Sequence, residues 1–90
     1  MNIKRWTIIF KALSNINRLK IIELLSDDRK MNVGEIAAAL RISFTATSNH
    51  LVLLQKLDVL EAEGRAGHVF YYLNPDMPKD FSKALGLFIR

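Results

Sequence analysis

The chain has 90 residues, 50% of them apolar, and 13 Lys and Arg against 9 Asp and Glu give it a formal charge of +4. A domain of this size buries only about 60 to 65% of the surface that its unfolded chain exposes, so we expect oligomerisation to add buried surface. The lack of cysteine excludes a disulfide framework, a thiolate metal site and thiol redox sensing, while the net charge favours an anionic partner such as nucleic acid or an acidic membrane.

The charged residues near the N-terminus also argue against membrane insertion. Lys4, Arg5 and Lys11 interrupt the apolar residues of the N-terminus, which therefore lacks the apolar run of a signal peptide. No stretch approaches the roughly 18 apolar residues that cross a bilayer. We expect a soluble, cytoplasmic protein without a membrane partner.

Two amphipathic helices are predicted first. Ile3, Trp6, Phe10 and Leu13 recur at steps of three and four, which predicts a helix over residues 3–13. Asn15 is a suitable N-cap for a second helix that ends at Asp27 and Asp28. The inner side of this helix is expected to carry Leu19, Ile22, Leu24 and Leu25.

A helix-turn-helix follows over about residues 33–57. Asn32 and Glu35 have the spacing of a capping box, which predicts a helix near residues 33–40. A tight connection then leads to Ser43, the predicted N-cap of a helix that runs to about Leu57. Two short helices joined in this way are typical of DNA-binding domains.

The rest of the chain predicts a hairpin and a last helix. Alternating residues from Leu60 and a β-branched and aromatic run that ends at Leu73 indicate a wing over about 60–73, with its tip at residues 64–67. Pro78 suits the first turn of a helix over about 78–89, whose apolar positions are Phe81, Leu85 and Phe88. The predicted fold is mainly α with a small β-hairpin: one winged helix-turn-helix domain over residues 1–90, with a helix added at each end.

The segment "FTATSNHLVLLQKL", residues 44–57, separates into two faces on a helical wheel. Thr47, Leu51 and Leu54 form the core face, flanked by His50 and Leu57. The opposite face consists of Thr45, Ser48, Asn49, Val52 and Lys56. Short hydroxyl and amide side chains on the first turns of such a helix can reach base edges or phosphates, although they would equally suit a solvated helix face.

Three stretches together resemble the ArsR-type winged helix-turn-helix repressors of bacteria: "FKALSNINRLKIIELL", "NVGEIAAALRISFTATSNHLVLLQKLDVL" and "EGRAGHVFYYLN". The resemblance implies a homodimer that binds double-stranded DNA through successive major grooves, and it places DNA contacts at Thr45, Ser48, Asn49 and His50 and, in the wing, at Arg65 and His68. We add Lys56, on the same polar face as Ser48. Asp58 stands where the family usually has glycine.

The resemblance does not extend to metal sensing. The positions of the family's cysteine-x-cysteine metal site hold Asn32 and Gly34 here, and the last helix offers Asp80 but no histidine for the other familiar site. We therefore expect no metal and no cofactor. We interpret His50 and His68 as DNA-contact or packing residues, and the sequence names no inducer.

The terminal helices and the wing tip each have a predicted role. The apolar residues of the terminal helices could fill one domain's core, but a two-fold interface would bury them better, and this interface is predicted to contain Trp6, Phe10, Phe81, Leu85 and Phe88. Arg65 lies between two turn glycines, from which its guanidinium could enter a minor groove.

No combination of residues indicates an enzyme. Ser48 and His50 lie two positions apart on a helix and point in different directions, and the glycines of residues 64–67 belong to a hairpin rather than a phosphate loop. We expect a sequence-specific DNA-binding regulator, by family default a repressor. The alternative is a winged helix that binds another protein, because the fold does not fix the function and Lys56 is the only charged side chain of the recognition helix.

Overall fold

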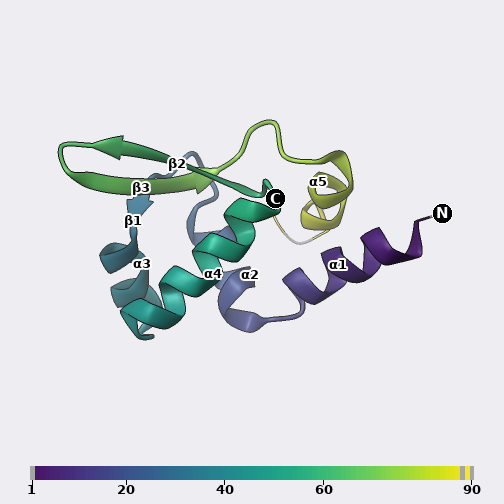
Figure 1. The fold of residues 1–90 in the computed structure, drawn as a ribbon, viewed down its shortest axis with the longest axis horizontal. Helices are drawn as coiled ribbons and strands as arrows, with labels where there is room; N and C mark the ends of the chain where they lie inside the picture. The colour runs from purple at the N-terminus through teal and green to yellow at the C-terminus, as the bar shows by residue number, and fades with distance from the viewer. Residues whose placement is uncertain (1, 88, 90) are drawn as a thin grey trace.

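A computed structural model describes residues 2–87 and 89 of the chain. In chain order the elements are α1 (Ile3–Leu13), α2 (Ile16–Leu24), β1 (Met31–Asn32), α3 (Val33–Leu40), α4 (Phe44–Lys56), β2 (Leu60–Arg65), β3 (His68–Leu73) and α5 (Lys79–Leu85). The β2–β3 hairpin and α3 lie at one end of the long axis, and α1 and α5 lie at the other (Figure 1). The chain therefore folds as a winged helix-turn-helix with a helix added at each end, as predicted.

Side-chain caps fix the starts of the first four helices. The Asn15 Oδ1 accepts hydrogen bonds from the backbone N–H groups of Asn17 and Arg18, which would otherwise lack partners in the first turn of α2. At α3 the predicted capping box is present, since Asn32 and Glu35 each bond the other's backbone N–H through a side-chain oxygen. These caps explain why the predicted and observed starts agree.

Two helix ends differ from prediction. The second helix stops at Leu24, because the chain turns there and both Asp27 and Asp28 adopt positive φ, at 63° and 61°. A helix cannot continue through left-handed residues. The last helix, α5, ends at Leu85 rather than near residue 89, and Pro78 is its N-cap with an extended ψ of 138°, not part of its first turn.

The sheet has a strand that was not predicted. Its order is β1-β3-β2, and all neighbours are antiparallel. β1 pairs Met31 with Tyr71, and two residues are too few to show an alternating pattern in the sequence. β1 leads directly into α3, so the sheet attaches the wing to the first helix of the helix-turn-helix.

All five helices contribute to one buried core. The residues with 1% exposure or less are Ile9, Ile21, Ile22, Leu25, Ile36, Leu51, Leu54, Val59, Leu60, Phe81 and Thr47. The inner side of the second helix was predicted incorrectly in part: Ile21 is fully buried, whereas Leu19 and Leu24 are half-buried. α1, whose contribution to the core is Ile9 and Ala12, leaves much of its apolar surface uncovered.

Asp58 forms the turn that separates α4 from the wing. The Val59 N–H donates to the Leu54 carbonyl oxygen at 3.0 Å and the Asp58 N–H donates to that of Gln55 at 3.0 Å, the two bonds of a Schellman motif. This motif requires a left-handed residue at Asp58, and its φ is 62°. Glycine is usual at this position in the family because it adopts a positive φ without steric cost. Asp58 forms the same turn although it has a Cβ.

A charged pair holds α5 against α1. Arg5 donates to both carboxylate oxygens of Asp80, from Nε at 2.8 Å and from Nη2 at 3.0 Å. The Arg5 guanidinium carbon also lies 5.3 Å from the centre of the Phe81 ring. The hydrogen bond from Arg5 lowers the pKa of Asp80 below its ordinary value of 3.8, so this carboxylate stays ionised at neutral pH.

Candidate nucleic-acid interface

The turn between α3 and α4 sets the angle of the candidate recognition helix. Arg41 closes α3 with a left-handed φ of 57°, and the Ile42 N–H donates to the Ala37 carbonyl oxygen at 3.2 Å. Ser43 then caps α4, since its Oγ accepts a hydrogen bond from the Ala46 N–H at 3.0 Å. Backbone groups at the end of α3 and at the start of α4 thus find hydrogen-bond partners within a three-residue connection.

α4 has the two faces that the sequence predicts. Thr47, Leu51 and Leu54 are fully buried, and the Thr47 hydroxyl donates to the Ser43 carbonyl oxygen at 2.8 Å. On the outer side Thr45 and Asn49 are exposed. The first two turns of α4 therefore present short polar side chains to solvent while the helix is anchored by its inner face.

His50 does not belong to this outer face. Its Nδ1 lies 3.4 Å from Nη1 of Arg18, whose Nε and Nη2 donate to the carbonyl oxygens of Ala12 and Lys11 at 2.6 and 2.9 Å. Burial, followed by the charge of Arg18, lowers the pKa of His50 below 6.5. The imidazole joins α4 to the end of α1 through Arg18, which is the packing role, one of the two roles expected for His50.

The wing ends in a tight turn that displays cationic and aromatic groups. Ala66 and Gly67 both have positive φ, at 51° and 80°, as a two-residue type I′ hairpin turn requires. Arg65 and His68 flank the turn and are exposed. The Arg65 Nη2 donates to Glu63 Oε1 at 2.9 Å, and Lys30 Nζ donates to the same oxygen at 3.1 Å. These two cations lower the pKa of Glu63, with the Lys30 hydrogen bond as the main cause.

A shallow hollow separates the start of α4 from the wing, and the sequence did not predict it. Phe44 and Ser48 of α4 and His68 and Val69 of β3 line this hollow. Phe44 is 62% exposed and Val69 is 49% exposed. No Asp, Glu, Lys or Arg is among the described residues that line it. An aromatic residue in a helix is ordinarily predicted to lie in the core. The sequence feature that argues against burial of Phe44 is its position directly after the N-cap.

Lys56, Arg5 and Arg18 differ in how free they are to contact a phosphate. Lys56 is exposed in the last turn of α4, about 18 Å along the helix axis from Phe44. Arg5 and Arg18 are engaged with Asp80 and with the end of α1. Of these cations, only Lys56 remains as a candidate phosphate contact on α4.

The predicted dimer residues divide into two groups. Phe81 and Leu85 are buried inside the chain's own core, because α5 packs back on α1, so the prediction that they need a partner is wrong. Trp6 is half-buried and Phe10 is 62% exposed, with ring centres 5.7 Å apart. Together with Ile3 they line an apolar hollow on α1. Phe88 lies outside the described residues.

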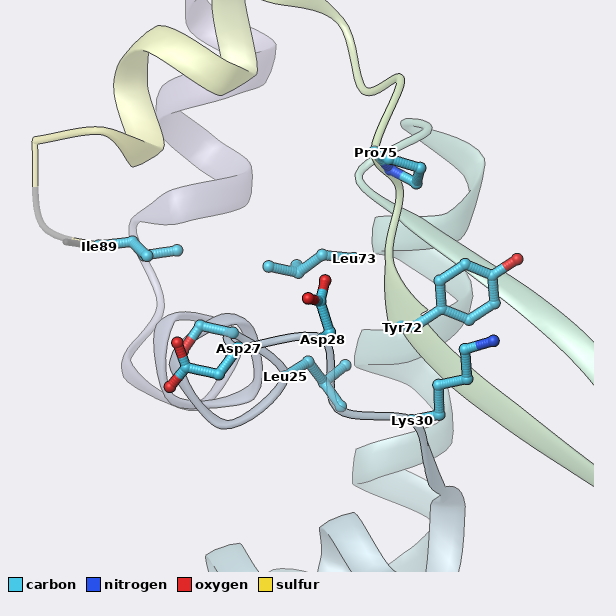
Figure 2. Close-up of a pocket in the computed structure, with 9 residues that line it drawn as sticks. Leu25, Asp27, Asp28, Lys30, Tyr72, Leu73, Pro75 and Ile89 are labelled. Atoms are coloured by element: carbon cyan, nitrogen blue, oxygen red, sulfur yellow. The ribbon is translucent and has the colours of Figure 1, made fainter.

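A third hollow lies near the C-terminal end of β3, between the turn after α2 and Ile89 (Figure 2). Leu25 and Leu73 are on its apolar side, and Asp27 and Asp28 contribute carboxylates. Neither carboxylate forms an ion pair with another described residue. Lys30 also lines the hollow, but its Nζ is bonded to Glu63, so the part of the hollow beside Asp27 and Asp28 would repel the phosphates of a DNA backbone.

Neither a cluster of metal-ligating side chains nor a membrane-spanning helix is present among residues 2–87 and 89. In this part of the chain no three His, Asp or Glu side chains gather in a way that could hold a metal ion. Across the same residues, no helix has both the length and the apolar character needed to cross a membrane.

The fold and this surface define a winged helix-turn-helix regulator, and sequence comparison gives its family. Residues 15–62 match the bacterial regulatory protein arsR family. The chain belongs to this family. The family members to which it is similar are transcriptional regulators, not enzymes.

Several members are similar over most of the chain. The transcriptional repressor SdpR of Bacillus subtilis is 33% identical over 72 residues, which cover 80% of this chain and 79% of SdpR. The cadmium resistance regulator CadC of Listeria innocua is 38% identical over 64 residues, 71% of this chain but only 54% of CadC.

Solved structures of similar proteins support the same fold. HlyU of Vibrio cholerae is a transcriptional activator. Its structure matches with a TM-score of 0.76 at 27% identity, and the match covers 98% of this chain and 98% of HlyU. A homodimeric winged helix-turn-helix DNA-binding domain from Mycobacterium bovis has a TM-score of 0.75 at 26% identity, over 93% of this chain and 74% of that one.

Proposed function

We propose that this protein is a sequence-specific DNA-binding repressor that acts as a homodimer on an inverted-repeat operator. The observation that carries the proposal is the outer face of α4, where Thr45, Ser48 and Asn49 occupy the first two turns of a helix anchored by Leu51 and Leu54. A recognition helix uses its N-terminal residues to contact base edges in the major groove. An asparagine there can bond an adenine through two hydrogen bonds.

The wing is proposed to contact the DNA backbone or minor groove. Arg65 and His68 flank its tip, and the β2–β3 hairpin projects beyond α3 and α4 at one end of the molecule (Figure 1). Arg65 reaches Glu63, an exchangeable partner on the surface. A phosphate or a narrow minor groove would offer this guanidinium a stronger negative potential.

The apolar face of α1 supports the homodimer. Ile3 and Phe10 are exposed, and Trp6 is only half-buried, although a chain of 90 residues has little apolar surface to spare. A two-fold interface would cover this face on both protomers at once. The Mycobacterium bovis domain, with the same fold, is homodimeric. Two recognition helices about 34 Å apart would then require half-sites one helical turn apart.

Repression is proposed as the family default: SdpR, which matches over 80% of this chain and 79% of its own, is a repressor, whereas HlyU, similar in structure over 98% of both chains, is an activator. Without cysteine the chain cannot sense metals or oxidants through thiolates. The alternative function, a winged helix that binds another protein, rests on the low charge of α4, where Lys56 is the only charged side chain.

The salt dependence of DNA binding separates these two functions. Fluorescence anisotropy with a labelled duplex would give the dissociation constant from low to physiological salt. If a dimer neutralises about eight phosphates, the slope of log affinity against log salt is about −7. A slope near zero, or no binding to DNA at physiological salt, would favour the protein-binding alternative.

A further inference from the structure

We propose that Phe44, supported by Val69 of the wing, reads the 5-methyl group of a thymine in the operator. This inference rests on the proposed function, because it assigns a base preference to one part of the DNA-binding surface. It concerns two apolar side chains to which the sequence had assigned no role.

The position of Phe44 is what gives it access to a base edge. It is the first residue of α4, directly after the N-cap Ser43, and it lies one turn before Ser48 on the same side of the helix. The N-terminal residues of a recognition helix contact base edges in the major groove. The Phe44 ring is 62% exposed, so the domain's own core does not use it.

The chemistry of the surrounding hollow favours a base over a phosphate. Phe44 of α4 and Val69 of β3 both line it, and the described lining residues include no Lys or Arg that could bind a phosphate. They also include no Asp or Glu that could accept a hydrogen bond from cytosine N4. In the major groove the thymine methyl is the apolar group that distinguishes one base pair from the others.

Neighbouring polar groups would complete the recognition. Ser48 and His68 line the same hollow and can bond base edges or phosphates beside the methyl group. Thr45 and Asn49 extend the polar face of α4 next to it. The methyl contact is therefore expected within or next to the base pairs that α4 reads, and not in a separate part of the operator.

Replacement of thymine by uracil removes only this methyl group and tests the inference. Each thymine of a duplex enriched from a random pool would be replaced in turn, with dissociation constants measured for the wild type and for Phe44→Ala. We expect one thymine in each half-site whose replacement weakens wild-type binding about fourfold, the equivalent of about 0.8 kcal/mol for a buried methyl. Phe44→Ala should bind the thymine and uracil duplexes equally well, and Phe44→Leu should keep the discrimination.

Ile16→Ala is a matched control, since Ile16, like Phe44, is the first residue of a helix directly after its N-cap, and it is 67% exposed. This variant should retain the wild-type uracil penalty. A penalty that persists in Phe44→Ala, or a set of duplexes in which no thymine is sensitive, would overturn the inference while leaving the proposed function intact. If no consensus duplex is enriched at all, both fail.

Discussion

Arg18 and His50 connect three helices of the domain. From α2, Arg18 bonds the carbonyl oxygens of Ala12 and Lys11 at the end of α1, and its Nη1 lies 3.4 Å from Nδ1 of His50 on α4. The contact requires a neutral imidazole that accepts the hydrogen bond. The candidate recognition helix is therefore linked to α1, whose exposed face is proposed to form the dimer.

This contact predicts a pH-dependent stability. Because folding lowers the pKa of His50, the unfolded chain binds more protons than the folded chain just below pH 6.5, and acidification through that range lowers the free energy of unfolding. His50→Gln keeps an acceptor but does not titrate. We expect urea unfolding midpoints to fall less between about pH 7.5 and 5 in this variant than in the wild type. His68→Gln, the control, should behave as the wild type; an unchanged pH dependence in His50→Gln would contradict the assignment.

The turn after α4 predicts a stabilising substitution. Asp58 has a φ of 62°, which is unfavourable for any residue with a Cβ. Asp58→Gly should raise the free energy of unfolding by about 0.5 kcal/mol, after the larger entropy of glycine in the unfolded chain is subtracted. Asp58→Ala removes the same charge but keeps the Cβ, so it should not stabilise. Chemical denaturation of both variants measures the difference, and equal stabilities would show that φ is not the cause.

The exposed face of α1 predicts the behaviour of a charged variant. Phe10→Glu should still fold, because Phe10 is 62% exposed within the chain, but it should prevent the proposed dimer. Loss of the second half-site contact should then weaken operator binding by roughly 100-fold or more. Sedimentation equilibrium and anisotropy measure the two effects. Ile16→Glu places the same charge on α2 and should change neither; a monomeric Phe10→Glu that binds with wild-type affinity would refute the dimer.

Removal of the Glu63 charge is predicted to increase the affinity for DNA. It accepts hydrogen bonds from both Lys30 and Arg65, and it competes with phosphate for these cations. Glu63→Gln should therefore tighten DNA binding and steepen its salt dependence. Arg65→Ala should weaken binding and make the salt slope less negative by about one per wing. If Arg65→Ala leaves the slope unchanged, the wing tip does not contact phosphate.

Much of the fold followed from local sequence rules. Asn15, Asn32 and Ser43 are caps whose effect lies within three residues, so the starts of α2, α3 and α4 were predictable. The ends at Leu24 and Leu85 were not, because they depend on how the following segments turn and pack. The two residues of β1 become a strand only through their pairing with β3.

Positions in the candidate site were predictable where the period of a single helix determines them. The outer position of Thr45 and Asn49 follows from helical period alone. The contact of His50 with Arg18, 32 positions away, and the hollow that Phe44 shares with the wing both depend on the tertiary fold. Such long-range relationships have no signature in a single sequence.

Selection of bound duplexes from a random DNA pool, by the purified protein at near-physiological salt, tests the central claim most directly. The structure predicts enrichment of an inverted repeat whose half-sites are centred about one helical turn apart, as two recognition helices of a dimer require. Recovery of no consensus, with residual binding that disappears as salt rises, would contradict sequence-specific regulation and favour a winged helix that binds another protein.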